Sequence, residues 1–249
     1  MGVASRSEKK RRQEAAAQRL AAAGITPQRR GAVPVLAVVG VVAVALVAGL
    51  VIWLVRGSGT AEAATYPVAA DGGVVLAGQT AAPVTVDVYS DYLCPGCERF
   101  EQAYRDELTE ALNDGQIVLR LHPIAVLDDR TNPPGFSTRA ANAVLCAVPA
   151  GIFPSLHDTF FAEQPAQGSA GLTDDQLVGI GTTLGATGDF AGCVRTGANQ
   201  ATVAAQTRAA LADPALRRDG AFGTPTVTVS GALVDVNDTA WLQNAIAAG

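Results

Sequence analysis

Two cysteines separated by a Pro-Gly pair stand between a strand-like segment and a helix-forming one. Residues 84–89 alternate with a period of two, and residues 98–113 contain many helix formers and no glycine or proline. The motif Cys94-Pro95-Gly96-Cys97 lies between them, so Cys94 is predicted to lie at a helix N-terminus. The helix dipole and unpaired N–H groups there favour a thiolate. A proline in the first turn loses only an N–H that the helix leaves unpaired.

A C-x-x-C pair on its own is also half of many zinc sites, so the other candidate ligands matter. The spacing of the cysteines and histidines matches no zinc ribbon or knuckle, and we predict no metal site. The residues concerned are Cys94, Cys97, His122, Cys146, His157 and Cys193.

Residues 33–55 form an uncharged run of 23 residues, long enough to span the hydrocarbon core of a membrane. Eight of the 18 lysines and arginines precede this run, and only Arg56 follows it directly. The positive-inside rule then predicts a cytoplasmic tail at residues 1–32 and an extracytoplasmic chain beyond a single membrane helix. A cleaved signal peptide is the alternative because residues 61–63 read Ala-Glu-Ala, although the apolar run exceeds the usual core of about 7 to 15 residues.

All four cysteines follow the apolar run, in a compartment where disulfides persist. Cys94 and Cys97 form a candidate redox pair, and Cys146 and Cys193, 47 positions apart, are candidates for a structural disulfide. On the loop-entropy model such a bond contributes about 4 kcal/mol. Pairings of Cys94 or Cys97 with Cys146 or Cys193 stay open on these grounds, although they would consume the redox motif.

Charge is distributed unevenly along the chain. From residue 57 onward there are nine arginines and no lysine against 21 acidic residues, a net charge of −12. A surface this acidic argues against nucleic acid or an anionic membrane surface as a partner. The basic N-terminal tail is explained by membrane topology rather than by RNA binding.

The remainder is predicted to be a linker followed by one α/β domain. Residues 56–73 are rich in small residues and are predicted to form the linker. Residues 74–249 are predicted to form the domain. A helical insertion is expected at about residues 136–212, where Thr173 starts a capping box. Strands are expected at residues 74–76, 84–89, 116–121, 226–229 and 232–236, helices of the insertion at 139–147, 152–162, 177–184 and 200–211, and a last helix from residue 239.

Three of these features together resemble the DsbA-like thiol-disulfide oxidoreductases, which have a thioredoxin fold with an inserted α-helical domain. Residues 90–97, Ser-Asp-Tyr-Leu-Cys-Pro-Gly-Cys, are similar to the active-site segment of the family. Residues 222–226, Phe-Gly-Thr-Pro-Thr, look like its cis-proline loop, and the helical insertion is the third feature. With its predicted anchor and second cysteine pair, the chain looks like the actinobacterial extracytoplasmic members.

This resemblance implies a thiol oxidase that donates the Cys94-Cys97 disulfide to reduced or unfolded secreted proteins. It implies a cis bond before Pro225 and a backbone contact between Thr224 and an extended substrate, with the two residues between the cysteines supporting the site. We expect a monomer that needs no cofactor and is reoxidised by a membrane quinone reductase of the DsbB or vitamin K epoxide reductase type. The alternatives are a disulfide reductase or isomerase, and a non-catalytic tethered binding module.

Departures from the family pattern predict a milder oxidant than the strongest DsbA enzymes. Gly96 stands where the family often has a histidine donor, and Val88 replaces a buried acid, with Asp87 on the opposite strand face. His122, at the end of the third strand, is expected to be structural, and His157 is assigned no role. Three acidic residues near the motif would oppose thiolate formation, namely Asp91, Glu98 and Glu101.

Overall fold

The computed structural model describes residues 63–249 and Arg11. The predicted cytoplasmic tail and the apolar run at residues 33–55 lie outside the described residues, apart from Arg11. Within the described part of the chain, no helix is both long enough and apolar enough to cross a membrane.

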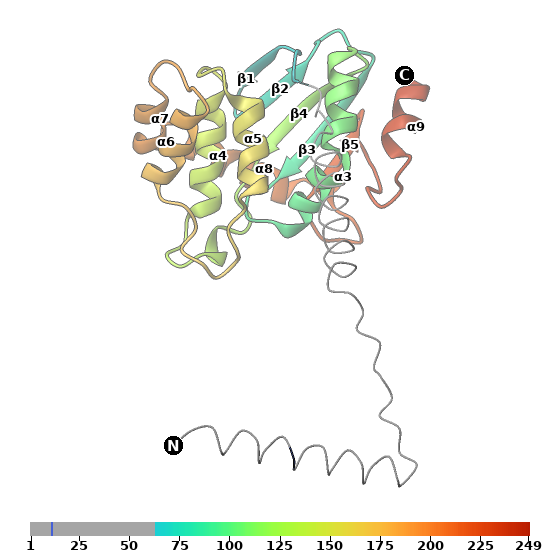
Figure 1. The fold of residues 1–249 in the computed structure, drawn as a ribbon. Helices are drawn as coiled ribbons and strands as arrows, with labels where there is room; N and C mark the ends of the chain where they lie inside the picture. Colours follow the sequence, from blue (N-terminus) through green and yellow to red (C-terminus); the bar gives the residue numbers. More distant parts are fainter. Residues whose placement is uncertain (1–10, 12–62) are drawn as a thin grey trace, which may run out of the picture. The chain divides into compact units, whose positions relative to one another are not determined.

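A six-stranded sheet runs through the domain in the order β1-β2-β4-β3-β5-β6 (Figure 1). β3 and β4 are parallel neighbours, paired from Val84 with Ile117 to Ser90 with Pro123. Both are mostly buried, which explains their apolar sequences. The other pairings are antiparallel. The strands are β1 (Val68–Asp71), β2 (Val74–Gly78), β3 (Val84–Ser90), β4 (Ile117–Pro123), β5 (Thr226–Val229) and β6 (Ala232–Leu233).

The helices follow the thioredoxin arrangement with an insertion between β4 and β5. Figure 1 shows α4, α5, α6 and α7 as a block beside the sheet, and α8 completes this insertion, whose helices lie within residues 136–212. The helices are α3 (Pro95–Asn113), α4 (Phe136–Ala147), α5 (Phe153–Ala162), α6 (Asp174–Thr183), α7 (Phe190–Thr196), α8 (Gln200–Ala212) and α9 (Trp241–Ala248), with short 3-10 turns η1 (Asp128–Arg130) and η2 (Pro214–Leu216).

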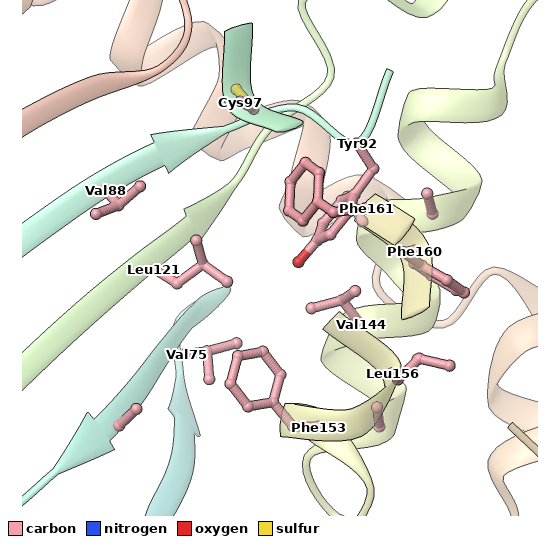
Figure 2. Close-up of a cluster of buried hydrophobic side chains, with 14 of the residues drawn as sticks. Val75, Val88, Tyr92, Cys97, Leu121, Val144, Phe153, Leu156, Phe160 and Phe161 are labelled. Carbon is pink, nitrogen blue, oxygen red and sulfur yellow. The ribbon is translucent and has the colours of Figure 1, made fainter. Parts of the chain in front are cut away.

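One continuous core joins the insertion to the sheet. On α3 the buried residues Phe100, Tyr104 and Leu108 are spaced four apart and therefore share one face. Figure 2 shows Phe153 of α5 pointing toward Val75 and Leu121 of the sheet. Full burial of a side chain of this kind contributes about 1.5–3 kcal/mol, so the core holds the insertion firmly against the strands that carry the cysteine motif.

The structure differs from the sequence-based expectations at three elements. Residues 68–71, assigned to the linker, form β1, which pairs with β2 through a turn at Gly72 and Gly73, both with positive φ. The short helix α7 was not predicted, and β6 ends at Leu233 rather than at residue 236. The expected capping box at Thr173 is confirmed and begins α6.

Candidate active site

The end of β3 and the start of α3 position the two cysteines of the motif. Cys94 is the N-cap residue of α3, with an extended backbone (φ −86°, ψ 116°), and Pro95 occupies the first turn. The Cys94 carbonyl accepts the Glu98 N–H at 3.1 Å, which starts the helix. The predicted place of Cys94 at a helix N-terminus is therefore confirmed.

The two sulfur-bearing residues differ in exposure. Cys94 keeps 8% of its surface exposed, whereas Cys97, one turn later, has none. Both are free thiols in this structure. Cys94 is therefore the more exposed of the two, and attack on one particular sulfur in disulfide exchange depends on such a difference in access.

Hydrogen bonds separate the pKa values of the two thiols. The pKa of Cys94 is lowered to about 5, first by a hydrogen bond from the Cys97 thiol. Burial opposes this shift, whereas the Thr224 hydroxyl and the N–H groups of Cys97 and Gly96 lower the pKa further. The pKa of Cys97 is raised well above its usual value, first by burial and then by its interaction with Cys94. At neutral pH the reduced site therefore holds one thiolate and one thiol.

The loop before β5 brings Thr224 and Pro225 to the sulfur of Cys94. The Thr224–Pro225 peptide bond is cis, as the family resemblance implied. The Thr224 carbonyl oxygen lies 3.2 Å from Cys94 Sγ and can accept a hydrogen bond from the thiol, which favours the protonated form. The Thr224 hydroxyl acts in the opposite direction because it stabilises the thiolate. The hydroxyl and the other donors prevail, since the net pKa shift is downward.

Gly96 fits closely between the cysteine motif and this loop. A Cβ at this position would lie 3.1 Å from the Thr224 oxygen, 3.2 Å from Pro225 Cδ and 3.4 Å from Cys94 Sγ. A side chain here would therefore press on the cis-proline loop. Glycine at position 96 lacks a donor, as the sequence indicated, and it also leaves the space that lets the loop approach the thiolate.

Asp91 has a structural role that the sequence analysis missed. It is fully buried, and its carboxylate accepts hydrogen bonds from the N–H of Leu93 at 2.9 Å, the N–H of Leu127 at 2.9 Å and the hydroxyl of Ser137 at 2.7 Å. Burial raises its pKa to about 6, and the charge of Cys94 adds to this effect. Asp91 thus ties the active-site segment to α4 and to the segment after β4.

Two glutamines of the insertion also hold the active-site segment. Gln164 Nε2 donates to the Cys94 carbonyl at 3.2 Å, and Gln167 Nε2 reaches the Leu93 carbonyl at 3.5 Å. Both lie in the connection between α5 and α6. The insertion therefore contributes directly to the geometry of the dithiol, in addition to covering the core.

The histidines have partners that the sequence did not reveal. His122 Nε2 donates to Asp87 Oδ1 at 2.8 Å on the sheet, and its ring stacks on Tyr89 at 4.1 Å, which supports the structural role expected for it. His157 lies between two partners: its Nδ1 is 2.7 Å from the Tyr92 hydroxyl and its Nε2 is 3.2 Å from Glu101 Oε1. His157, to which the sequence analysis assigned no role, therefore joins Tyr92 to Glu101.

The second cysteine pair forms a disulfide away from the dithiol. Cys146 of α4 and Cys193 of α7 are bonded, with their Cα atoms 5.9 Å apart. This is the pairing that the sequence favoured, and it leaves Cys94 and Cys97 to each other. In residues 63–249 no group of three or more histidine, cysteine or acidic side chains is placed to hold a metal ion.

Two comparisons with known sequences give matches over most of the chain. A family model described as Thioredoxin matches residues 70–248. The serine/threonine-protein kinase PknE of Mycobacterium tuberculosis is 33% identical over 193 residues, which cover 75% of this chain and 33% of the kinase. The chain thus spans about a third of the length of the curated relatives that it matches.

Solved structures show the same fold. MdbA, a thiol-disulfide oxidoreductase from Corynebacterium matruchotii, is similar with a TM-score of 0.64 and 19% identity, covering 74% of this chain and 92% of that one. Oxidised DsbA of Mycobacterium tuberculosis is similar with a TM-score of 0.59 and 24% identity, covering 73% and 90%. At these identities the similarity establishes the fold of the chain.

Proposed function

Because the chain belongs to the thioredoxin family and carries the Cys94-Cys97 dithiol, it is a DsbA-like protein disulfide oxidoreductase, and we propose that it acts as a thiol oxidase on secreted proteins. The observation that carries this proposal is the difference between the two thiols. An accessible Cys94 with a pKa of about 5 stands beside a buried Cys97 with a raised pKa.

The reaction follows from this difference. With the enzyme in its disulfide form, a substrate thiolate attacks Cys94 Sγ, the Cys94–Cys97 bond breaks, and Cys97 leaves with the electron pair and takes up a proton. The second substrate thiol loses its proton and attacks the substrate sulfur of the mixed disulfide, and Cys94 leaves as a thiolate. The substrate is oxidised by two electrons and the dithiol is reduced by the same two.

The low pKa of Cys94 favours the oxidising direction for two reasons. A thiol of low pKa is a good leaving group in the second step. A stabilised thiolate also stabilises the reduced enzyme, which raises the reduction potential of the couple. The peptide backbone at Thr224, beside the cis bond, supports a substrate held in an extended conformation.

We further propose an extracytoplasmic location and a single N-terminal membrane anchor. The apolar run at residues 33–55, the basic residues before it and the disulfide between Cys146 and Cys193 support this location. An anchored monomer would be reoxidised by a membrane quinone reductase of the DsbB or vitamin K epoxide reductase type. The substrates would be reduced or unfolded secreted proteins, and the acidic surface argues against nucleic acid.

A disulfide reductase or isomerase is the second candidate. Gly96 supplies no side-chain donor to the thiolate, which favours a lower potential than that of a strong oxidase. A non-catalytic binding module is a third reading, against which the separated pKa values of the two thiols weigh. Kinase activity is not proposed on the similarity to PknE, since the chain spans only a third of that protein.

The test is the oxidation of a reduced, unfolded ribonuclease by the full-length chain in its disulfide form. The proposal expects rapid formation of substrate disulfides with wild type and with Cys146→Ser/Cys193→Ser, and none above background with Cys94→Ala. No acceleration by the wild type would reject the oxidase, and equal rates with Cys94→Ala would reject any catalytic role of the dithiol.

A further inference from the structure

A second cavity, separate from the dithiol, lies between α3, α5, the sheet and residues 63–66. Its volume is about 410 Å³, which is within the range of small-molecule sites. Neither Cys94 nor Cys97 lines it. The proposed oxidase reaction therefore leaves this cavity without a role.

Aromatic and aliphatic side chains form most of its walls. Phe100 of α3, Phe153 of α5 and Tyr66 present aromatic rings, and Leu121 and Val88 of the sheet lie beneath. Figure 2 shows the ring of Phe153 directed toward the strands that carry Val75 and Leu121. Aromatic rings carry a negative face and therefore attract a cation as well as apolar groups.

Acidic side chains dominate the polar part of the lining. Glu101, Asp106 and Asp158 stand against two basic side chains, Arg105 and His157. Arg105 is engaged by Asp106 at 3.1 Å, and His157 by Glu101 at 3.2 Å. The third carboxylate, that of Asp158, forms no ion pair with either of these basic side chains.

Asp158 is the unpaired group of this cavity. Among the described residues, none donates a hydrogen bond to its carboxylate or forms an ion pair with it within 4.0 Å. Burial raises its pKa against the opposing charges of His157 and Arg105, neither of which forms an ion pair with it. A partly buried carboxylate without a direct partner is costly, and a cation bound beside it would lower that cost.

Tyr66 lies close to the same carboxylates. Its pKa is raised to about 12, first by burial and then by the charges of Asp158 and Glu101. Its hydroxyl has no hydrogen-bond partner within residues 63–249 and is free to serve a ligand. The rings, the phenol and the unpaired carboxylate thus line one cavity.

We propose that this cavity is a binding site for a small organic ammonium compound with an apolar body. The apolar body lies against Phe100, Phe153 and Leu121, and the ammonium group lies between the Asp158 carboxylate and the ring of Tyr66. An anion would meet the excess of carboxylates, and a neutral compound would leave Asp158 unpaired. The site is therefore selective for positive charge.

The test compares three probes of one shape with the full-length chain in a nonionic detergent at neutral pH. Phenethylamine is the cation, 2-phenylethanol the neutral compound and phenylacetate the anion, and isothermal titration calorimetry gives each Kd. The proposal expects the amine to bind at least about tenfold more tightly than the alcohol, and phenylacetate to bind more weakly than both. Each probe is also titrated into the detergent buffer without protein, and the heat of partitioning into micelles is subtracted.

Asp158→Asn keeps the size of the side chain and removes its charge, and is expected to weaken amine binding about tenfold without affecting the alcohol. Asp175→Asn, an exposed carboxylate on α6 paired with Arg195 at 3.0 Å, is the matched control and should bind like wild type. Cys94→Ser should also bind like wild type, which separates this site from the proposed oxidase. The proposal is overturned if the amine does not bind, if amine and alcohol bind equally, or if Asp158→Asn keeps wild-type affinity.

Discussion

Replacing Thr224 by valine removes the hydroxyl that stabilises the Cys94 thiolate and keeps the branched shape and the backbone carbonyl. A hydrogen bond to a charged group contributes about 1.5–3 kcal/mol, and one pKa unit corresponds to about 1.4 kcal/mol. The pKa of Cys94, about 5 in the wild type, should therefore rise by about 1 to 2 units. Because a tenfold change in thiolate stability shifts a two-electron potential by about 30 mV, the reduction potential should fall by about 30–60 mV.

The assay follows the ultraviolet absorbance of the thiolate in the reduced protein as the pH is raised. Cys97 does not interfere in the acidic range because its pKa is raised well above the usual value. Thr228→Val is the matched control, since Thr228 is buried in β5 and does not contribute to the lowered pKa of Cys94. An unchanged pKa in Thr224→Val, or an equal rise in Thr228→Val, would refute the role assigned to the hydroxyl.

Three further outcomes are expected. The pKa of Asp91 is raised to about 6 in the folded protein and is about 3.9 in the unfolded chain, so the protonated form favours folding. As the pH rises from about 3 to about 7, the oxidised protein should therefore lose about 3 kcal/mol of unfolding free energy relative to Asp91→Asn, measured by chemical denaturation at each pH. A difference that does not change with pH would contradict the burial of the charge. Ser137→Ala removes the hydroxyl that donates to Asp91 at 2.7 Å. It should lower the free energy of unfolding by about 1–3 kcal/mol and raise the pKa of Asp91 further. Full stability of this variant would show that the donor is dispensable. The Cys146–Cys193 disulfide joins residues 47 positions apart, and removing it should lower the free energy of unfolding by about 4 kcal/mol. The pKa of Cys94 should stay unchanged, and a shifted pKa would show that the disulfide shapes the active site.

The dithiol could be predicted because the signals that identify it are local. A strand pattern, two cysteines around Pro95 and Gly96, and a run of helix formers lie within about 30 consecutive residues, and the structure arranges them as expected. The hydrogen bond from the Leu93 N–H to the Asp91 carboxylate is also local, since the two residues are two positions apart. It could have been predicted from the sequence, because an aspartate just before a helix commonly makes such a turn.

Other parts of the site depend on contacts that no sequence pattern encodes. The Ser137 hydroxyl reaches Asp91 across 46 positions, and His157 reaches Tyr92 across 65. These partners are set by the packing of the insertion against the sheet rather than by periodicity or spacing. For this reason the sequence analysis treated Asp91 only as an acidic residue near the motif and assigned no role to His157.

β1 was missed for a different physical reason. Three of the four residues of β1 are exposed, so the segment lacks the alternation of a half-buried strand, and its small residues resemble a tether. What makes it a strand is its pairing with β2 across the turn at Gly72 and Gly73. Edge strands of this kind are defined by their hydrogen bonds to a neighbour more than by their own side chains.

The most direct test of the proposed oxidase is the reduction potential of the Cys94-Cys97 couple in the full-length protein. The protein is equilibrated with glutathione buffers of known potential, and the free thiols are trapped and counted. A thiol oxidase is expected to have a potential near or above about −180 mV. A value near −270 mV would contradict that function and assign the protein to the disulfide reductases.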